Sequence, residues 1–228
     1  MSSALIIAAA GQGRRMKNQL NKQYLKLAGK PVVSYSLAAA LAANCFTQIV
    51  VVVTPGEEEL FRRDVLLPFF PEQELHVVTG GKERQDSVSN GLAVLVEKVT
   101  YVCVHDGARP LAEAALFARC LKVAQARGAA IAAVRVKDTI KVVDDKGQVL
   151  TTPPREQLWA VQTPQFFRRD WLELAHQRAK EEGFQGTDDA SLLEHYGYPV
   201  QIIQASYENI KVTTPEDLLL AEAVLGRR

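Results

Sequence analysis

The sequence has no acidic residue before Glu57. The 56 residues ahead of it hold six basic residues, whereas the remaining 172 carry 21 basic and 26 acidic ones. The formal net charge of the whole chain is +1. This balance argues against a dedicated binder of nucleic acid or of membrane surfaces, because such proteins are usually strongly basic. One short segment of a neutral chain is therefore a concentrated cationic site. Its residues are Arg14, Arg15, Lys17, Lys22, Lys26 and Lys30.

Cysteine and long apolar runs are also scarce. The three cysteines, Cys45, Cys103 and Cys120, are odd in number and lack CxxC spacing, so they predict buried, reduced thiols in a cytoplasmic protein, and not a disulfide framework or a zinc site. No apolar run reaches the roughly 18 residues of a membrane helix. The apolar segment 4–10 is too short for a signal peptide and has no basic region before it. We expect no membrane partner.

Two common nucleotide motifs are incomplete or absent. Gly11 and Gly13 fit the start of a dinucleotide fingerprint, but Met16 stands where the third glycine is expected. The acidic residue about 20 positions later is missing too, which disfavours a Rossmann dehydrogenase. The P-loop pattern GxxxxGK[ST] does not occur.

What the sequence does contain is an alternation of strand-like and helical segments, which predicts one α/β domain over residues 1–228 with a mostly parallel sheet covered by helices on both faces. Ligands bind beyond the carboxyl ends of the strands in such sheets. The expected strands are 5–10, 49–53, 75–78, 101–104, 129–136 and 200–204. The expected helices are 31–43 (with Pro31 at its first position), 57–67, 85–96, 111–127, 171–182, 188–195 and one that starts at Pro215 after an N-cap at Thr214.

The alternation breaks within residues 137–160. Residues 139–150 are β-prone around a polar turn at 144–147 and predict a hairpin, and the prolines at 153 and 154 exclude a helix after it. A hairpin inserted this late would project from the domain as an arm. Isolated hairpins are marginal in water, so we expect the arm to pack on a partner subunit.

Three segments carry candidate chemistry. The glycines at 11 and 13, with Arg14, Arg15 and Lys22 beside them, suit a polyphosphate, although a tight turn with solvated charges gives the same pattern. Asp106 follows a buried strand, and a carboxylate that faces phosphates implies Mg²⁺ between them; capping of the next helix or pairing with Arg109 is the structural alternative. His105 fits a packed core residue. Residues 80–87 form a second glycine turn that enters a helix, where capping by Asp86 competes with nucleotide binding.

Together these motifs resemble the 2-C-methyl-D-erythritol 4-phosphate cytidylyltransferase family nearly end to end. The first loop and HDGARP alone indicate only the wider nucleotidyltransferase superfamily. The matching runs are AAAGQGRRM (8–16), KQY (22–24), ERQDSV (83–88), VHDGARP (104–110), KDTIK (137–141), TPQFF (163–167), TDDAS (187–191) and NIKVTTPED (209–217).

The resemblance implies a Rossmann-like, doubly wound fold of the nucleotide-diphospho-sugar transferase type, with a projecting β-hairpin arm that joins a homodimer. It also implies that CTP and the sugar-alcohol phosphate give the CDP-alcohol and pyrophosphate, with Mg²⁺ as cofactor. Arg15 and Lys22 would stabilise the pentavalent phosphorus, and Asp106 would hold Mg²⁺. The other implied contacts are as follows: Ala9, Ala10, Gly11, Gly13 and Arg14 to the CTP phosphates, Gly81, Lys82, Ser87 and Gly107 to the cytidine, and Arg155 and Lys211, with Arg109, Thr139, Thr163 and Thr187, to the acceptor. In the family the arm reaches the other protomer, so Thr139 and Arg155 would serve the partner's site.

The sequence departs from the family pattern at three positions. Asn21 stands where a proline is usual, Lys82 where an acid is frequent, and Gly107 where alanine is common. None of these removes a charged group with an implied role, and the role of Glu208 and Asn209 stays open. Two other functions remain as alternatives: a ribitol-5-phosphate cytidylyltransferase, which shares the loop and the HDxARP motif, and a nucleotide-binding protein without turnover.

Overall fold

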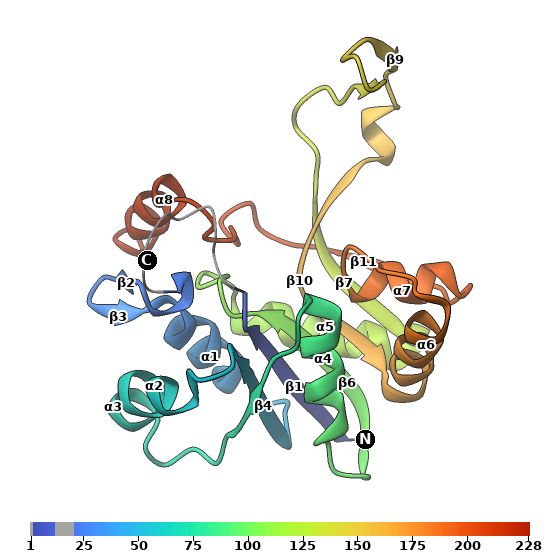
Figure 1. Cartoon of the computed structure of the whole chain (residues 1–228). Helices are drawn as coiled ribbons and strands as arrows, with labels where there is room; N and C mark the ends of the chain where they lie inside the picture. Colours follow the sequence, from blue (N-terminus) through green and yellow to red (C-terminus); the bar gives the residue numbers. More distant parts are fainter. Residues whose placement is uncertain (1, 12–20) are drawn as a thin grey trace.

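A seven-stranded sheet forms the centre of the computed structural model, which describes residues 2–11 and 21–228 (Figure 1). The strand order is β11-β7-β10-β6-β1-β4-β5. All of the strands run parallel except β10, which is antiparallel to both β6 and β7. This confirms the expected mostly parallel sheet. The bounds are β1 Ser2–Ala9, β4 Gln48–Val53, β5 His76–Thr79, β6 Val99–Asp106, β7 Ala129–Arg135, β10 Trp159–Arg168 and β11 Gln201–Gln204.

The central strands are mostly apolar because helices cover both faces of the sheet. Side chains alternate between the faces along a strand: Leu5 and Ile7 of β1 belong to one core cluster, and Ala4 and Ile6 belong to the other. The first cluster includes residues of α1 and α5, and the second includes residues of α4, α6 and α7. The bounds are α1 Val32–Ala42, α4 Arg84–Ala93, α5 Ala114–Arg127, α6 Arg169–Glu182 and α7 Asp189–His195.

The remaining elements lie around this frame. The segment expected as one helix over 57–67 forms α2 Glu58–Phe61, a π-helical turn η3 Arg62–Leu66 and α3 Leu67–Phe69. Strands β2 Lys26–Leu27 and β3 Lys30–Pro31 follow the turn η2 Lys22–Tyr24. The last helix, α8 Pro215–Leu225, packs through a third, smaller apolar cluster that includes Leu27 and Val212. Its expected start is confirmed, since Thr214 is the N-cap and forms a capping box with Asp217.

Most helix ends also agree with the sequence. Helices α5 and α6 end at Gly128 and Gly183, whose φ angles of 93° and 69° favour glycine. Several helix starts differ from expectation by one to three residues, and α6, for example, begins at Arg169 and not at residue 171. Pro31 is the N-cap of α1 and not its first helical residue, because it pairs with Lys26 in the β2–β3 ladder. Helix α5 begins at Ala114 and not at residue 111.

The segment between β7 and β10 extends away from the sheet (Figure 1). It contains the short strands β8 Val142–Val143 and β9 Val149–Thr151, joined by a turn in which the Asp144 carboxylate accepts the backbone N–H groups of residues 146 and 148. A turn of 3₁₀ helix, η4 Arg155–Gln157, then leads back to β10. The projecting hairpin arm is therefore confirmed, although its strands are shorter than expected.

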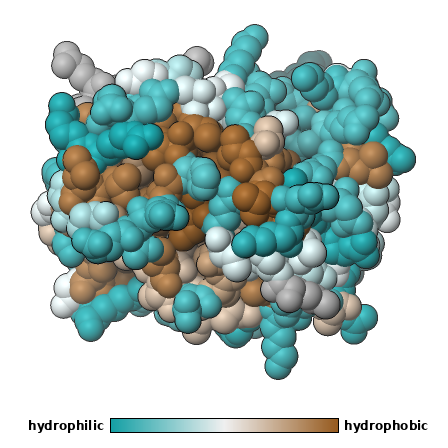
Figure 2. All heavy atoms as spheres, turned by 90° about the horizontal axis from the view of Figure 1, so that it is seen from below, coloured by the Kyte–Doolittle hydropathy of each residue, from teal (hydrophilic) through white to brown (hydrophobic). Residues whose placement is uncertain are grey.

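The end of the molecule opposite the arm carries a hydrophobic surface patch (Figure 2). Val94 and Val96, which connect α4 to β6, are 39% and 43% exposed. In the part of the chain that the structure describes, no helix is long and apolar enough to cross a membrane.

Candidate active site

A cavity of about 710 Å³ lies where four parallel strands end. The residues that directly follow β1, β4, β5 and β6 reach one edge of the sheet, as doubly wound topology dictates. Its volume is within the usual range for small-molecule sites. Lys211, on the segment between β11 and α8, completes the wall. The lining residues are Ala8, Ala10, Gly11, Lys22, Gln23, Thr54, Pro55, Gly80, Gly81, Lys82, Glu83, Arg84, Ser87, Asp106, Ala108 and Lys211.

The first glycine loop contributes Ala10 and Gly11 to the cavity. Ala9, which the sequence also suggested, does not line it: its side chain is buried in the core, and its carbonyl accepts a hydrogen bond from the Gln23 amide. The expected Gly13, Arg14 and Arg15 lie outside the described residues.

The second glycine turn packs closely against the first loop. A Cβ at Gly80 would meet the Cβ of Ala10 and would lie 2.8 Å from the Ser87 Oγ. Position 80 therefore has room only for glycine. Ser87 is 4% exposed, and its hydroxyl accepts the Gly81 N–H at 3.1 Å and donates to the Glu83 carbonyl at 3.0 Å. These hydrogen bonds hold the turn rigidly at the N-terminus of α4.

Helix α4 begins at this turn with a reciprocal cap between Glu83 and Asp86. The Glu83 N–H donates to the Asp86 carboxylate at 3.0 Å, so the capping role expected as an alternative for Asp86 is observed. Lys82 lies directly before the cap and lines the cavity. The start of α4 therefore places the cation of Lys82 at the cavity, which suits an anionic ligand.

Asp106 is the electrostatic centre of the site. Its carboxylate lies 2.8 Å from the Lys211 Nζ, 3.5 Å from the Arg109 Nε and 3.7 Å from the Arg84 Nε. Burial by itself would raise the pKa of Asp106, but Lys211, Arg84 and Arg109 outweigh it and hold the pKa well below its ordinary value. The carboxylate is therefore ionised at neutral pH. Its expected pairing with Arg109 is present, beside two further cations.

Buried polar groups fix the backbone of this segment. The Thr163 hydroxyl, from β10, accepts the Asp106 N–H at 3.0 Å and shares a hydrogen bond with the His105 Nδ1 at 2.9 Å. Burial lowers the pKa of His105 to about 3, so the ring is neutral and packs against Phe117. Both are core groups, and neither lines the cavity. The expectation that His105 is a packed residue agrees with this.

Arg109 and Asn209 form a second support behind Asp106. The Arg109 guanidinium donates to the Asn209 carbonyl at 2.8 Å. The Asn209 amide, 1% exposed, donates to the Gln162 side chain at 2.8 Å and to the Thr163 carbonyl at 2.9 Å. Neighbouring Glu208 instead pairs with Arg227 and Arg228 at the surface. In the described structure, Asn209 is thus a structural residue and Glu208 faces away.

Arg84, for which no role was predicted, lines the cavity and bridges two buried carboxylates. Its guanidinium lies 2.6 Å from Asp189 and 3.7 Å from Asp106. Asp189 is 1% exposed and also contacts the His176 Nε2 at 3.3 Å. Burial would raise the pKa of Asp189, but Arg84 and His176 lower it below its ordinary value. Only the position of Arg84 at a helix start beside a glycine turn could have signalled it.

Besides Ala9, Arg109 and Thr163, four more residues with an expected contact do not line the cavity of their own chain. Thr139 and Arg155 are exposed on the arm, where the Arg155 guanidinium donates to the Lys137 carbonyl at 3.1 Å. Thr187 is exposed beside α7, and Gly107 is buried with its N–H bonded to the Ala8 carbonyl. Thr54, Pro55, Gln23 and Gly80, in contrast, line the cavity without having been predicted to do so.

A metal ion fits this site in one way only. Within residues 2–11 and 21–228, no group of three or more His, Cys, Asp or Glu side chains could hold a metal. Mg²⁺ commonly takes one or two carboxylates together with phosphate oxygens. Asp106, ionised and on the cavity wall, suits such a shared site and not a site built from protein ligands alone.

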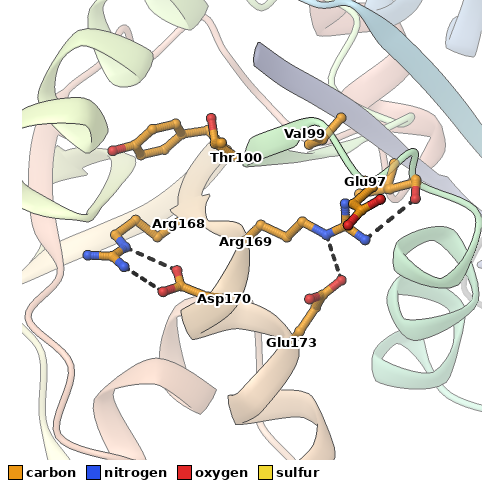
Figure 3. A pocket seen from close by; sticks show the side chains of 9 residues that line it. Glu97, Val99, Thr100, Arg168, Arg169, Asp170 and Glu173 are labelled. Atoms are coloured by element: carbon orange, nitrogen blue, oxygen red, sulfur yellow. Dashed lines mark hydrogen bonds and ion pairs between the residues drawn. The ribbon is translucent and has the colours of Figure 1, made fainter. Parts of the chain in front are cut away.

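A second cavity, of about 670 Å³, lies at the opposite edge of the sheet (Figure 3). Its two arginines are both engaged: Arg168 pairs with Asp170, and Arg169 pairs with Glu173 and donates to the Val96 carbonyl. The first cavity, with glycine turns, cations and Asp106, is the candidate active site.

Comparison with known proteins agrees with this choice. The family model described as 2-C-methyl-D-erythritol 4-phosphate cytidylyltransferase matches residues 3–227. The chain belongs to this family. Two relatives of that name are the proteins of Desulforamulus reducens, 48% identical over 98% of this chain and 95% of the relative, and of Pelotomaculum thermopropionicum, 49% identical over 99% and 94%.

A solved structure extends the likeness to three dimensions. The 4-diphosphocytidyl-2C-methyl-D-erythritol synthase of Anaerococcus prevotii superposes with a TM-score of 0.88 at 30% identity, over 99% of both chains. The α/β fold and the family expected from the motifs are therefore confirmed, and the family is one of nucleotidyltransferases.

Proposed function

We propose that this chain transfers the cytidylyl group of CTP to 2-C-methyl-D-erythritol 4-phosphate, a step of non-mevalonate isoprenoid precursor synthesis. An oxygen of the acceptor phosphate forms a bond to the α-phosphorus of CTP, and the bond from that phosphorus to pyrophosphate breaks. The observation that carries the proposal is the cavity at the four strand ends, where two glycine turns meet Lys22, Lys211 and Asp106 in a chain of this family.

The reaction needs little proton transfer. A phosphate monoester, with a second pKa of about 6, is already an anion at neutral pH. Catalysis then consists of positioning and of stabilising charge at the α-phosphorus. We assign Lys22, with Arg15, to that charge, and Lys211, with Arg155, to the acceptor phosphate. We assign the loop residues 10, 11, 13 and 14 to the CTP phosphates, and residues 81, 82 and 87 to the cytidine. We assign Thr139 and Thr187 to the acceptor, and Arg109 and Thr163 to the support of the site from behind.

We further propose that Asp106 and the triphosphate oxygens share Mg²⁺. When bound, Mg²⁺ would neutralise charge on the triphosphate and on the departing pyrophosphate. The ion pair between Asp106 and Lys211 at 2.8 Å already keeps this carboxylate ionised and oriented. Arg109 contacts this carboxylate from behind, and the Thr163 hydroxyl holds the backbone N–H of Asp106.

The arm supports a homodimer. Five large apolar side chains on it are 40–64% exposed, which is unusual for a short hairpin in water. Thr139 and Arg155 lie on the arm and outside their own cavity, as contacts to a partner's site would. The apolar side chains on the arm are those of Ile140, Val142, Val143, Val149 and Leu150.

We also propose a cytoplasmic location, which the free thiols of all three cysteines favour.

The test of the reaction is pyrophosphate release with CTP and Mg²⁺ against each of two acceptors. We expect turnover with 2-C-methyl-D-erythritol 4-phosphate. Turnover with ribitol 5-phosphate alone would support the other cytidylyltransferase instead, and none with either acceptor would support a non-catalytic nucleotide binder. Omitting Mg²⁺ and adding EDTA should abolish the signal.

The dimer is tested by complementation. Arg155→Ala and Lys22→Ala enzymes, each inactive alone, are mixed under conditions of subunit exchange. If the arm serves the partner, a hybrid dimer keeps one complete site, and activity should return to about a quarter of the parental value for statistical mixing. Mixtures that stay inactive would assign each arm to its own chain.

A further inference from the structure

The residues on both sides of Lys22 are anchored by hydrogen bonds. The Asn21 amide donates to the Thr54 Oγ1 at 3.0 Å and to the Glu57 carboxylate. Gln23, 2% exposed, donates to the Ala9 carbonyl. The segment that carries Lys22 is therefore fixed one residue before it and one residue after it.

Thr54 connects this segment to the end of β1. Its hydroxyl accepts from Asn21 and donates to the Ala10 carbonyl at 3.3 Å. The register of β1 and β4 brings these groups together, because Ala9 pairs with Val53 and the next residues of the two strands are Ala10 and Thr54. We call this set of bonds, from the Ala10 carbonyl through Thr54 and Asn21 to Glu57, the clasp.

The clasp holds Asn21 in a conformation that proline adopts without help. Asn21 has φ −60° and ψ 139°, and the proline ring locks φ near −65°. Proline would meet this constraint on φ, but it has no side-chain amide to donate. In this chain the hydrogen bonds of the Asn21 side chain hold the backbone conformation that a proline ring would fix covalently. Asn21 is thereby held in place directly before η2.

We propose that Thr54 and Asn21 are positioning residues that fix the backbone of Lys22 relative to the first glycine loop, so that its ammonium meets the charge at the α-phosphorus. The inference rests on the catalytic role proposed above for Lys22. A lysine side chain has four flexible carbons, so the position of its ammonium group depends on where its backbone is held. Misplacement by 1 Å costs a catalytic group about 100-fold in rate.

The experiment separates backbone positioning from direct contact with substrate. kcat and the KM for CTP are measured for Thr54→Val, Thr54→Ser, Asn21→Ala and Asn21→Pro. We expect Thr54→Val and Asn21→Ala to lower kcat about tenfold, a fraction of the loss for a 1 Å misplacement, with the KM for CTP changed less than about threefold. Thr54→Ser keeps the hydroxyl, and Asn21→Pro restores the φ constraint, so each should recover most of that loss.

Thr47→Val is the matched control. Thr47 precedes β4 at its other end, and its hydroxyl donates to the Ser3 carbonyl at 3.2 Å. The same substitution there removes a similar hydrogen bond far from the cavity and should leave kcat at the parental value. Melting temperatures of all variants report any general loss of stability.

Three results would overturn the inference. Thr54→Val with a kcat equal to that of Thr47→Val would remove the role of the clasp. Asn21→Pro as slow as Asn21→Ala would show that the amide itself, and not the backbone conformation, matters. Lys22→Ala with the parental kcat would remove the role of Lys22 and the inference with it. An inactive Lys22→Ala together with a Thr54→Val enzyme at the parental kcat would contradict only the role of the clasp.

Discussion

Asp189→Asn should destabilise the protein more than any exposed ion-pair substitution. The change keeps the size of the side chain and removes the charge that pairs with Arg84 at 2.6 Å. Asp189 is 1% exposed, so no water replaces the lost interaction. Arg84 is left with Asp106 at 3.7 Å as its remaining carboxylate within ion-pair distance in the described structure.

The size of the effect follows from the burial of both partners. Removing one partner of a buried ion pair costs about 3–5 kcal/mol, because the other charge stays buried and uncompensated. The Arg84 side chain is 30% exposed at the cavity, so water compensates part of that loss. We therefore expect the free energy of unfolding to fall by about 2–3 kcal/mol, below the full range for a completely buried pair.

Urea unfolding at pH 7, followed by tryptophan fluorescence at one protein concentration, measures this free energy. Asp170→Asn is the matched control, because it removes the same charge from an exposed ion pair. The Arg168 side chain of that pair is 45% exposed and the Asp170 side chain 60% exposed. Exposed pairs contribute about 0–1 kcal/mol. Equal losses for the two variants would refute the reasoning from burial.

The pH dependence gives a second check with a definite sign. The pKa of Asp189 is lower in the folded chain than its ordinary value of about 3.9. Its contribution to stability is therefore complete above about pH 4 and is lost as the pH falls through the lower, folded value. The difference in the free energy of unfolding between the parent and Asp189→Asn should be constant from about pH 6 to 8 and should become smaller below about pH 4. A difference that grows in acid would contradict this assignment.

Three further substitutions and reactions test the site and the core. Gly80→Ala should raise the KM for CTP about tenfold or more and lower the melting temperature, because its Cβ would meet Ala10 and Ser87; Gly226→Ala, whose Cβ has room, is the control, and equal effects would contradict the packing argument. Burial raises the pKa of Cys45 to about 11 and of Cys120 to about 12, so a disulfide reagent at pH 8 should react with three thiols per chain only after unfolding, and fast reaction of the folded enzyme would oppose this. Asp106→Asn should lower kcat about 100-fold and shift the Mg²⁺ titration of activity to higher concentration; an unshifted titration would argue against a shared metal.

The parts of the fold that could be predicted are those whose pattern is local. β4 was evident because residues 49–53 are five consecutive β-branched apolar residues, as expected for a strand inside a sheet covered on both faces. The start of α8 was evident because Thr214 and Pro215 form a cap without help from distant residues. The loop cations, glycines and Asp106 could be selected because strand ends are where such sheets bind ligands.

The longest strand could not be predicted in the same way. β10 contains Pro164, and proline inside a run usually argues against a central strand. The structure accommodates it at an irregularity: the pairing with β7 shifts register between Val161 and Gln165. Buried amides of Asn209 and Gln162 satisfy the polar groups there. These partners are more than 40 residues apart, so no local pattern announces them.

The site shows the same limit. Arg84 and Asp189 are 105 positions apart, and only the packing of α4 against the α6–α7 layer brings them together. Thr54 had one signal, its position directly after a buried strand, but a lone threonine there does not indicate a hydrogen-bond bridge. Positions were therefore predictable, whereas partnerships over long separations were not.

The antiparallel position of β10 has a consequence for the order of assembly. β10 lies between β6 and β7, so during synthesis β6, with its apolar and mostly buried side chains, has an open edge until residue 168 has left the ribosome. An open, apolar edge can template pairing with another chain. Asp106 likewise receives its backbone partner, Thr163, 57 residues after itself, and Lys211 later still. The site is therefore completed only late in synthesis, and until then the half-sheet β6-β1-β4-β5 has an open edge at which misassociation is favoured.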